Sequence, residues 1–185
     1  FTPYQEKALG LLERDFSESA LCGIKDPRAS RLLPFWQSVF GRAGMDDCYV
    51  IALRNPISVA RSLSARNGFM PEKSYQLWLS HMLAAIRDTV GKPRIVVDYD
   101  ALMADPIVQL DRIGGALGLP VTDTTERAIA EYADSFLSGS LRHGVQDSVT
   151  VRDDPRVGEL VGKAYHLLRQ LAQDVVLTPQ QRLAF

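Results

Sequence analysis

The residue that most strongly suggests chemistry is Arg54, which follows the apolar run CYVIAL at residues 48–53. A guanidinium at the end of a buried strand requires an anion or water, because its stem is easily buried and its charge is not. Asn55 and Pro56 are typical of the start of a helix, whose free N–H groups also favour an anion. Ser62, eight residues after Arg54, could add a hydroxyl donor to the same anion. The spacing is also compatible with an Arg54 that pairs with a neighbouring carboxylate and a Ser62 that is merely solvated.

A second candidate group lies in the stretch IKDPR, where Lys25, Asp26 and Arg28 follow the short apolar run at residues 20–24. A lysine in this position could neutralise an anionic group during its transfer, and a carboxylate could accept a proton. Pro27 stiffens the turn that carries them. The alternative interpretation is an ordinary surface turn with three charged side chains.

These residues require a scaffold in which strands alternate with helices. Short apolar runs predict strands at 20–24, 48–53 and 94–102. Such runs, separated by amphipathic segments, indicate an α/β fold with a parallel sheet flanked by helices on both faces. Ligands of such sheets bind at the carboxyl ends of the strands, so we expect Lys25, Arg54 and Tyr99 to line one rim. Helices are predicted at 4–15, 31–44, 55–67, 71–91, 105–120, 122–137 and within 154–174.

Composition narrows the function classes. The 185 residues carry 21 basic and 22 acidic side chains, so the net charge of −1 argues against nucleic-acid binding as the main role. The two cysteines, Cys22 and Cys48, are expected to be buried thiols of a reduced, cytoplasmic protein, and no spacing suggests a metal site. No apolar run is long enough to span a membrane. The chain begins with Phe1 rather than Met, and we expect it to be part of a longer protein.

In combination, these motifs resemble one enzyme family. The motifs and their order resemble those of the PAPS-dependent sulfotransferases, especially bacterial members. In this chain the order is IKDPR…LP.W, YVIALRNPISVARSL..R, LW and VDYDALMADPIVQLDRIGGALGLP. PAPS is 3′-phosphoadenosine-5′-phosphosulfate, the co-substrate that donates the sulfuryl group. The resemblance covers roughly residues 20–145. It implies one sulfotransferase-like domain over 1–185 with the three-layer, P-loop NTPase-like fold.

The resemblance also implies roles for individual residues. Arg54 and Ser62 match the pair that holds the 3′-phosphate of PAPS, and the LRHG stretch with Arg142, His143 and Gly144 matches the loop that closes over it. Lys25, Asp26 and Arg28 match the catalytic segment, although the family's catalytic histidine is absent and Asp26 is the local substitute. The segment YDALMADP is implied to be mainly structural. The implied reaction transfers a sulfuryl group to a hydroxyl of a saccharide or small metabolite, without a metal.

One family feature is not found. The loop that binds the 5′-phosphosulfate lies between the first strand and first helix of the family, and its place would be before Phe1. Two alternatives therefore stay open. One is a P-loop nucleotide or small-molecule kinase, which would need a Walker motif and an acidic strand end for Mg²⁺, neither of which the sequence indicates. The other is a non-catalytic sulfotransferase-like binding module. The oligomeric state is not predicted.

Overall fold

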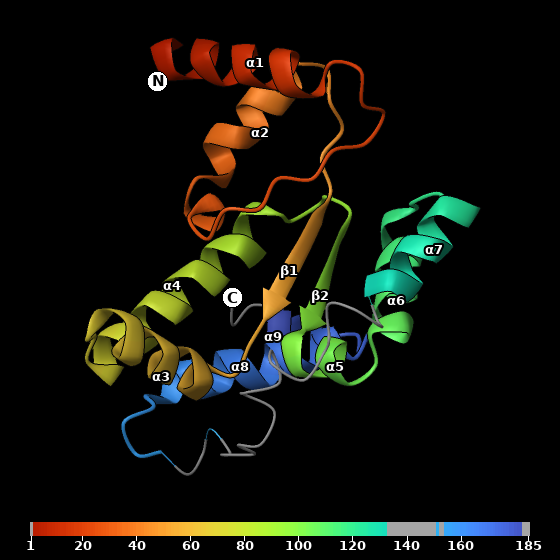
Figure 1. Ribbon diagram of the computed structural model, residues 1–185. Coiled ribbons are helices and arrows are strands. Elements are labelled where there is room, and N and C mark those ends of the chain that lie inside the picture. The colour runs from red at the N-terminus through yellow and green to blue at the C-terminus, as the bar shows by residue number, and fades with distance from the viewer. Residues whose placement is uncertain (1, 133–150, 152–153, 183–185) are drawn as a thin grey trace.

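The chain forms a small parallel sheet enclosed largely by helices (Figure 1). The computed structural model describes residues 2–132, 151 and 154–182. The order of its elements is α1 (Thr2–Phe16), the 3₁₀ turn η1 (Ala29–Arg31), α2 (Leu33–Arg42), β1 (Tyr49–Leu53), α3 (Pro56–Asn67), α4 (Pro71–Asp88), β2 (Arg94–Asp98), α5 (Tyr99–Ala104), α6 (Pro106–Leu117), α7 (Asp123–Glu131), α8 (Glu159–Ala172) and α9 (Pro179–Arg182).

In the described residues the sheet consists of β1 and β2, which pair in parallel with Ile51 opposite Val96. The connection between them runs through α3 and α4, as a parallel pair requires. The middle three residues of β2 are buried, whereas β1 alternates, with Ile51 and Leu53 buried and Val50 49% exposed. One face of β1 is therefore covered by helices, and the other is open.

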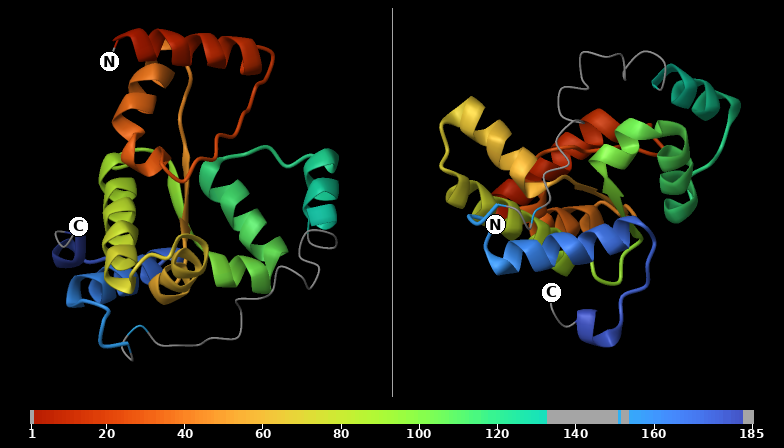
Figure 2. Two further views of the ribbon diagram at one scale, coloured as in Figure 1. Left: turned by 60° about the vertical axis from the view of Figure 1, so that its left-hand side comes forward. Right: turned by 90° about the horizontal axis from the view of Figure 1, so that it is seen from below.

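The main hydrophobic core lies between the sheet, α3, α4 and α8. Tyr75 and Trp78 of α4 and Leu168 of α8 are buried there against Leu53 of β1. The apolar face of α4 is thus a packing surface. A smaller cluster around Leu12 and Val39 joins α1 to α2, and Figures 1 and 2 show this pair of helices beyond the amino ends of the strands.

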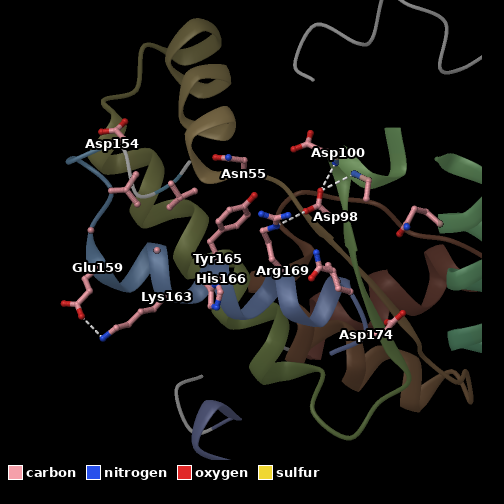
Figure 3. A pocket seen from close by; sticks show the side chains of 18 of the residues that line it. Asn55, Asp98, Asp100, Asp154, Glu159, Lys163, Tyr165, His166, Arg169 and Asp174 are labelled. Atoms are coloured by element: carbon pink, nitrogen blue, oxygen red, sulfur yellow. Dashed lines mark hydrogen bonds and ion pairs between the residues drawn. The ribbon is translucent and has the colours of Figure 1, made fainter. Parts of the chain in front are cut away.

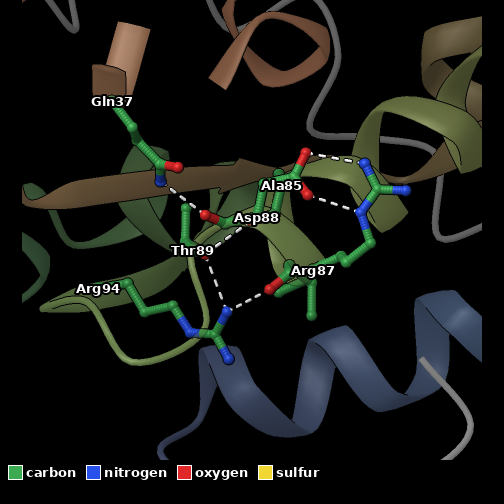
Figure 4. Close-up of polar contacts among 7 residues, drawn as sticks. Gln37, Ala85, Arg87, Asp88, Thr89 and Arg94 are labelled. Carbon is green, nitrogen blue, oxygen red and sulfur yellow. Dashed lines mark hydrogen bonds and ion pairs between the residues drawn. The ribbon is translucent and has the colours of Figure 1, made fainter. Parts of the chain in front are cut away.

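The carboxyl end of α4 is fastened to its neighbours by hydrogen bonds (Figure 4). Thr89 Oγ1 donates to the carbonyl oxygen of Ala85 at 2.6 Å, and Nη1 of Arg94, the first residue of β2, donates to Thr89 Oγ1 at 2.8 Å. Gln37 Nε2 of α2 donates to the carbonyl oxygen of Asp88 at 2.6 Å. Buried polar groups are normally hydrogen-bonded, so these contacts fix the position of the end of α4 relative to the start of β2.

Three sequence expectations are wrong. Residues 20–24 do not form a strand; they belong to the connection between α1 and η1. The strand expected at 94–102 ends at Asp98, because the Asp98 side chain caps a new helix, α5. The cysteines are not buried: Cys22 is half-buried and Cys48 is exposed. The general class, a parallel sheet flanked by helices, is confirmed, although helices dominate.

Candidate functional site at the carboxyl edge of the sheet

Arg54 follows the last residue of β1 and lies at the carboxyl edge of the sheet. Its guanidinium carbon is 4.6 Å from the centroid of the ring of Tyr99, which follows the last residue of β2. Nε1 of Trp78 on α4 donates to the carbonyl oxygen of Arg54 at 3.0 Å, which fixes the backbone of this residue. Among the described residues, Arg54 Nε is buried without a hydrogen-bond partner. An unsatisfied buried donor on a cation is the kind of group that an anionic ligand completes.

The helix after Arg54 begins as the sequence indicates. Asn55 Oδ1 accepts a hydrogen bond of 2.9 Å from the backbone N–H of Ile57, with Pro56 at the first helical position. The N-terminus of α3 therefore lies beside Arg54, with its dipole favouring an anion at the same edge. Ser62 is exposed on α3, about two turns further along. Whether Ser62 and Arg54 converge on one phosphate stays a prediction.

Two carboxylates belong to the same edge. Asp98 Oδ1 accepts hydrogen bonds from the backbone N–H groups of Asp100 at 2.8 Å and Ala101 at 3.3 Å, which caps α5. Asp98 Oδ2 lies 3.9 Å from Arg169 Nε. Burial raises the pKa of Asp100 and the charge of Asp98 adds to this, whereas Arg54 and Arg169 oppose it. The two arginines therefore act on the same carboxyl group, one from β1 and one from α8.

Helix α8 lines an open groove with a volume of about 1150 Å³ that reaches this edge. Figure 3 shows Tyr165 and Arg169 extending from α8 toward Asn55, Asp98 and Asp100. The guanidinium carbon of Arg169 lies 5.9 Å from the centroid of the Tyr165 ring, so the edge carries a second arginine–tyrosine contact beside that of Arg54. Burial raises the pKa of the Tyr165 hydroxyl, which keeps it a neutral hydrogen-bonding group.

Most other charges of the groove are paired within the protein. Lys163 Nζ lies 2.6 Å from Glu159 Oε1 one turn earlier on α8. Arg112 Nε of α6 lies 2.6 Å from Asp174 Oδ2, and Arg112 Nη2 also donates to the carbonyl oxygen of Val96 at 3.1 Å. Within the described residues no cluster of three or more His, Cys, Asp and Glu side chains could hold a metal ion.

One wall of the groove is held by a buried carboxylate. Asp154, 8% exposed, accepts hydrogen bonds from the Arg156 side chain at 2.9 and 2.8 Å, and from its backbone N–H at 2.9 Å. Tyr75 of α4 donates to Asp154 Oδ2 at 3.0 Å. The hydrogen bonds of Arg156 hold the pKa of Asp154 well below its usual range, and burial with the Asp154 contact raises the pKa of Tyr75 to about 12. These contacts fasten the segment before α8 to α4.

The residues Lys25, Asp26 and Arg28 are not brought to the carboxyl edge, because the strand expected before them is not formed. The segment 17–28 passes beyond the amino ends of β1 and β2 (Figures 1 and 2). Asp26 accepts hydrogen bonds from the Arg28 side chain at 3.0 and 2.6 Å and from its backbone N–H at 2.7 Å. These bonds lower the pKa of Asp26 to about 2, which makes it a weak proton acceptor. The catalytic role of Lys25, Asp26 and Arg28 stays a prediction, and this geometry does not favour it.

The remaining predicted binding residues, Arg142, His143 and Gly144, lie outside the described residues. Conversely, no sequence motif points to Asp100, Tyr165 or Arg169. Asp100 lies in a segment interpreted as structural, and Tyr165 and Arg169 lie on one face of an ordinary amphipathic helix. Their spacing of four residues places them together on α8, but no local pattern indicates that this face meets the end of β2.

Comparison with known proteins identifies no relative: no family model, no curated protein and no solved structure matches the chain. In the described part of the chain, no helix combines the length and apolar character needed to cross a membrane.

Proposed function

We propose that this chain is a sulfotransferase-like domain that binds the 3′-phosphate of PAPS at the carboxyl edge of β1. The observation that carries the proposal is Arg54, a partly buried cation whose Nε is buried without a hydrogen-bond partner among the described residues, beside the N-terminus of α3. The Arg-Asn-Pro sequence that produces this arrangement is the motif on which the family resemblance rests. A phosphate oxygen accepting from Arg54 Nε would satisfy the donor and neutralise the charge in one contact.

The proposal includes the three-layer, P-loop NTPase-like fold of the sulfotransferases, in which a sheet with more strands than β1 and β2 lies between two layers of helices. Val50 is half exposed, and in the described residues β1 pairs along one edge only. An apolar strand in this position leaves its hydrogen-bonding groups free for a neighbour. A further strand beside β1 is therefore compatible with the arrangement of the helices, and the sulfotransferase fold requires one.

The proposed reaction is the transfer of a sulfuryl group from PAPS to a hydroxyl of a saccharide or small metabolite. The acceptor oxygen forms a bond to sulfur, the bond from sulfur to the bridging phosphate oxygen breaks, and the acceptor proton passes to a base. The products are a sulfate ester and 3′-phosphoadenosine-5′-phosphate, called PAP. In this proposal Arg54 supplies binding energy at a phosphate that does not react, so its main effect is on the affinity for the nucleotide.

The structure adds one feature that the kinase alternative requires, since β2 ends in an acidic residue, Asp98. In the sequence this residue lies inside a longer predicted strand, at 94–102. Its Oδ1 caps α5 and its Oδ2 faces Arg169, so both oxygens already have protein neighbours. A carboxylate whose Oδ1 caps α5 and whose Oδ2 faces a cation is poorly placed to bind Mg²⁺, so we favour sulfuryl transfer.

The direct test is calorimetric titration of the chain with PAP and with adenosine 5′-phosphate, which lacks the 3′-phosphate. We expect PAP to bind at least about tenfold more tightly, and Arg54→Ala to weaken PAP binding by about 1.5–3 kcal/mol, the contribution of a hydrogen bond to a charged group. Arg87→Ala is the matched control, because Arg87 is an exposed arginine on α4 paired with Asp88. Equal binding of the two nucleotides by the unmodified chain would reject the proposal.

A second measurement addresses the reaction itself. With PAPS and a panel of hydroxylated acceptors, we expect release of PAP that depends on the acceptor and is reduced by Arg54→Ala mainly through a higher KM for PAPS. PAP binding without any acceptor-dependent release would support the non-catalytic module instead.

A further inference from the structure

The cations of the groove differ in how firmly the protein holds them. Arg112 and Lys163, which line the groove, and Arg156, which lies between the lining residues Pro155 and Val157, are in ion pairs of 2.6–2.8 Å. Arg169 differs from these three, because its contact with Asp98 spans 3.9 Å, which is beyond hydrogen-bond distance. Little favourable interaction is lost when such a half-exposed, long ion pair is broken. Arg169 is therefore the cation of this group that a ligand can recruit most easily.

Its position brings this cation to the same edge as Arg54. The Arg169 side chain is 52% exposed, lies against the Tyr165 ring and points toward Asp98 at the end of β2 (Figure 3). Arg54 reaches the edge from β1 and lies on Tyr99, the residue after Asp98. The guanidinium of Arg54, which follows β1, thus contacts Tyr99, and that of Arg169 on α8 faces the preceding residue, Asp98.

We propose that Arg169 is a second binding residue for the phosphate that Arg54 recognises, and that on ligand binding it exchanges Asp98 for that phosphate. This inference rests on the proposed function, because it assumes a phosphate at Arg54. Two guanidinium groups can surround a phosphate with paired N–H donors, which one arginine cannot do alone. The exchange would also connect α8 to the carboxyl end of β1 through the ligand.

The contacts of Asp98 make this exchange feasible. Its Oδ1 holds the N-terminus of α5 through the backbone N–H groups of Asp100 and Ala101, and only Oδ2 faces Arg169. Asp98 can therefore release Arg169 without losing its capping role. Asn is also a strong helix cap, so Asp98→Asn keeps α5 in place and removes the charge that competes with the ligand.

The test compares the unmodified chain with Arg169→Ala, Arg169→Lys and Arg54→Ala by calorimetric titration with PAP. We expect Arg169→Ala to weaken binding at least about tenfold, and Arg169→Lys to restore part of the loss because it keeps the charge without the planar fork. The dependence of binding on salt between about 50 and about 200 mM should also become weaker in Arg169→Ala. Arg87→Ala, which removes an exposed, ion-paired arginine of α4 that does not line the groove, should stay within about twofold of the unmodified chain.

A second arm tests the exchange. Asp98→Asn should tighten PAP binding in the unmodified chain, and this gain should be largely lost in the Arg169→Ala background. Thermal unfolding of each variant without ligand shows whether it is folded, and Arg169→Lys provides the comparison if Arg169→Ala is not.

The outcomes separate this inference from the proposed function. If Arg54→Ala loses affinity and neither Arg169 variant does, the inference is overturned and the proposed function stands. The inference is also overturned if Asp98→Asn increases affinity as much in the Arg169→Ala background as in the unmodified chain. The gain would then come from a general loss of negative charge, and the proposed function would stand. If the unmodified chain does not distinguish PAP from adenosine 5′-phosphate, both are overturned.

Discussion

The guanidinium carbon of Arg54 lies 4.6 Å from the centroid of the Tyr99 ring, so the residues that follow the two parallel strands contact each other. The contact turns the guanidinium toward the end of β2, where its Nε is buried without a hydrogen-bond partner among the described residues. The aromatic face stabilises the cation without occupying its donors. Arg54 is thereby positioned and remains able to bind an anion.

The ring of Tyr99, and not its hydroxyl, is expected to matter for nucleotide binding. Tyr99→Phe keeps the aromatic face and should leave PAP affinity nearly unchanged. Tyr99→Ala removes a cation–π contact of about 0.5–1 kcal/mol, which corresponds to roughly a two- to fivefold loss of affinity. Calorimetric titration with PAP measures both variants. A loss in Tyr99→Phe equal to that in Tyr99→Ala would assign the effect to the hydroxyl and contradict the geometry.

Asp100 should reduce stability at neutral pH. Burial, with the charge of Asp98, raises the pKa of Asp100 in the folded chain. The protonated Asp100 side chain therefore stabilises the fold fully below the unfolded pKa of about 3.9. This stabilisation is lost as the pH rises through the pKa of Asp100 in the folded chain. We expect Asp100→Asn to be more stable than the unmodified chain at pH 7, with the difference shrinking toward pH 4.

Urea unfolding between pH 4 and pH 8 measures this difference. Asp111→Asn, which removes an exposed carboxylate from α6, shows whether any loss of negative charge has the same effect. A stability gain in Asp100→Asn that did not vary with pH would rule out titration as its cause.

The two Asp-Pro-Arg sequences should differ in importance although their geometry is the same. Asp154 and Asp26 each accept hydrogen bonds from the backbone and side chain of the arginine two residues later. Asp154 is buried and also accepts from Tyr75, whereas the Asp26–Arg28 pair is largely exposed. We expect Asp154→Asn to lower the free energy of unfolding and Asp26→Asn to have little effect.

Tyr75→Phe isolates the contact to α4 and should cost about 1.5 kcal/mol, the lower range for a hydrogen bond to a charged group. Because the pKa of Asp154 is lowered, its stabilising effect is present above the unfolded pKa of about 3.9 and is lost as the pH falls through the folded value. Urea unfolding at pH 7 tests the effect of Tyr75→Phe, and the same measurement repeated at about pH 3 and below tests the loss of the Asp154 contribution. Equal effects of Asp154→Asn and Asp26→Asn would show that burial does not distinguish the two motifs.

Trp78 is expected to hold the backbone from which Arg54 extends. Trp78→Phe leaves the Arg54 carbonyl oxygen without the 3.0 Å hydrogen bond from Nε1, at a cost of about 1–3 kcal/mol in the free energy of unfolding. Denaturant unfolding measures the loss. The control is Trp36→Phe, which removes an indole from α2 in the smaller cluster. The PAP affinity of Trp36→Phe should be unchanged, whereas that of Trp78→Phe should fall.

Much of the local structure could be predicted from the sequence. Asn55, Pro56 and Gly68 mark the two ends of α3, and the structure has the Asn55 cap and a left-handed Gly68 at those places. These signals are strong because the capping atom and the helix it caps are a few residues apart, so no distant part of the chain is needed. The placement of Arg54 directly after a strand follows from the same kind of local pattern.

What the tertiary structure alone decided is which side chains meet. The apolar run at 20–24 is suitable for a strand, but a strand forms only with a partner. No described residue pairs with this run, which leaves Lys25 away from the edge. Arg169 reaches Asp98 because packing of α8 against β2 overcomes the entropy of closing a long loop, which no local pattern encodes. Local backbone chemistry thus determined the ends of α3 and the position of Arg54, whereas long-range burial determined which apolar runs pair as strands and which side chains surround Arg54.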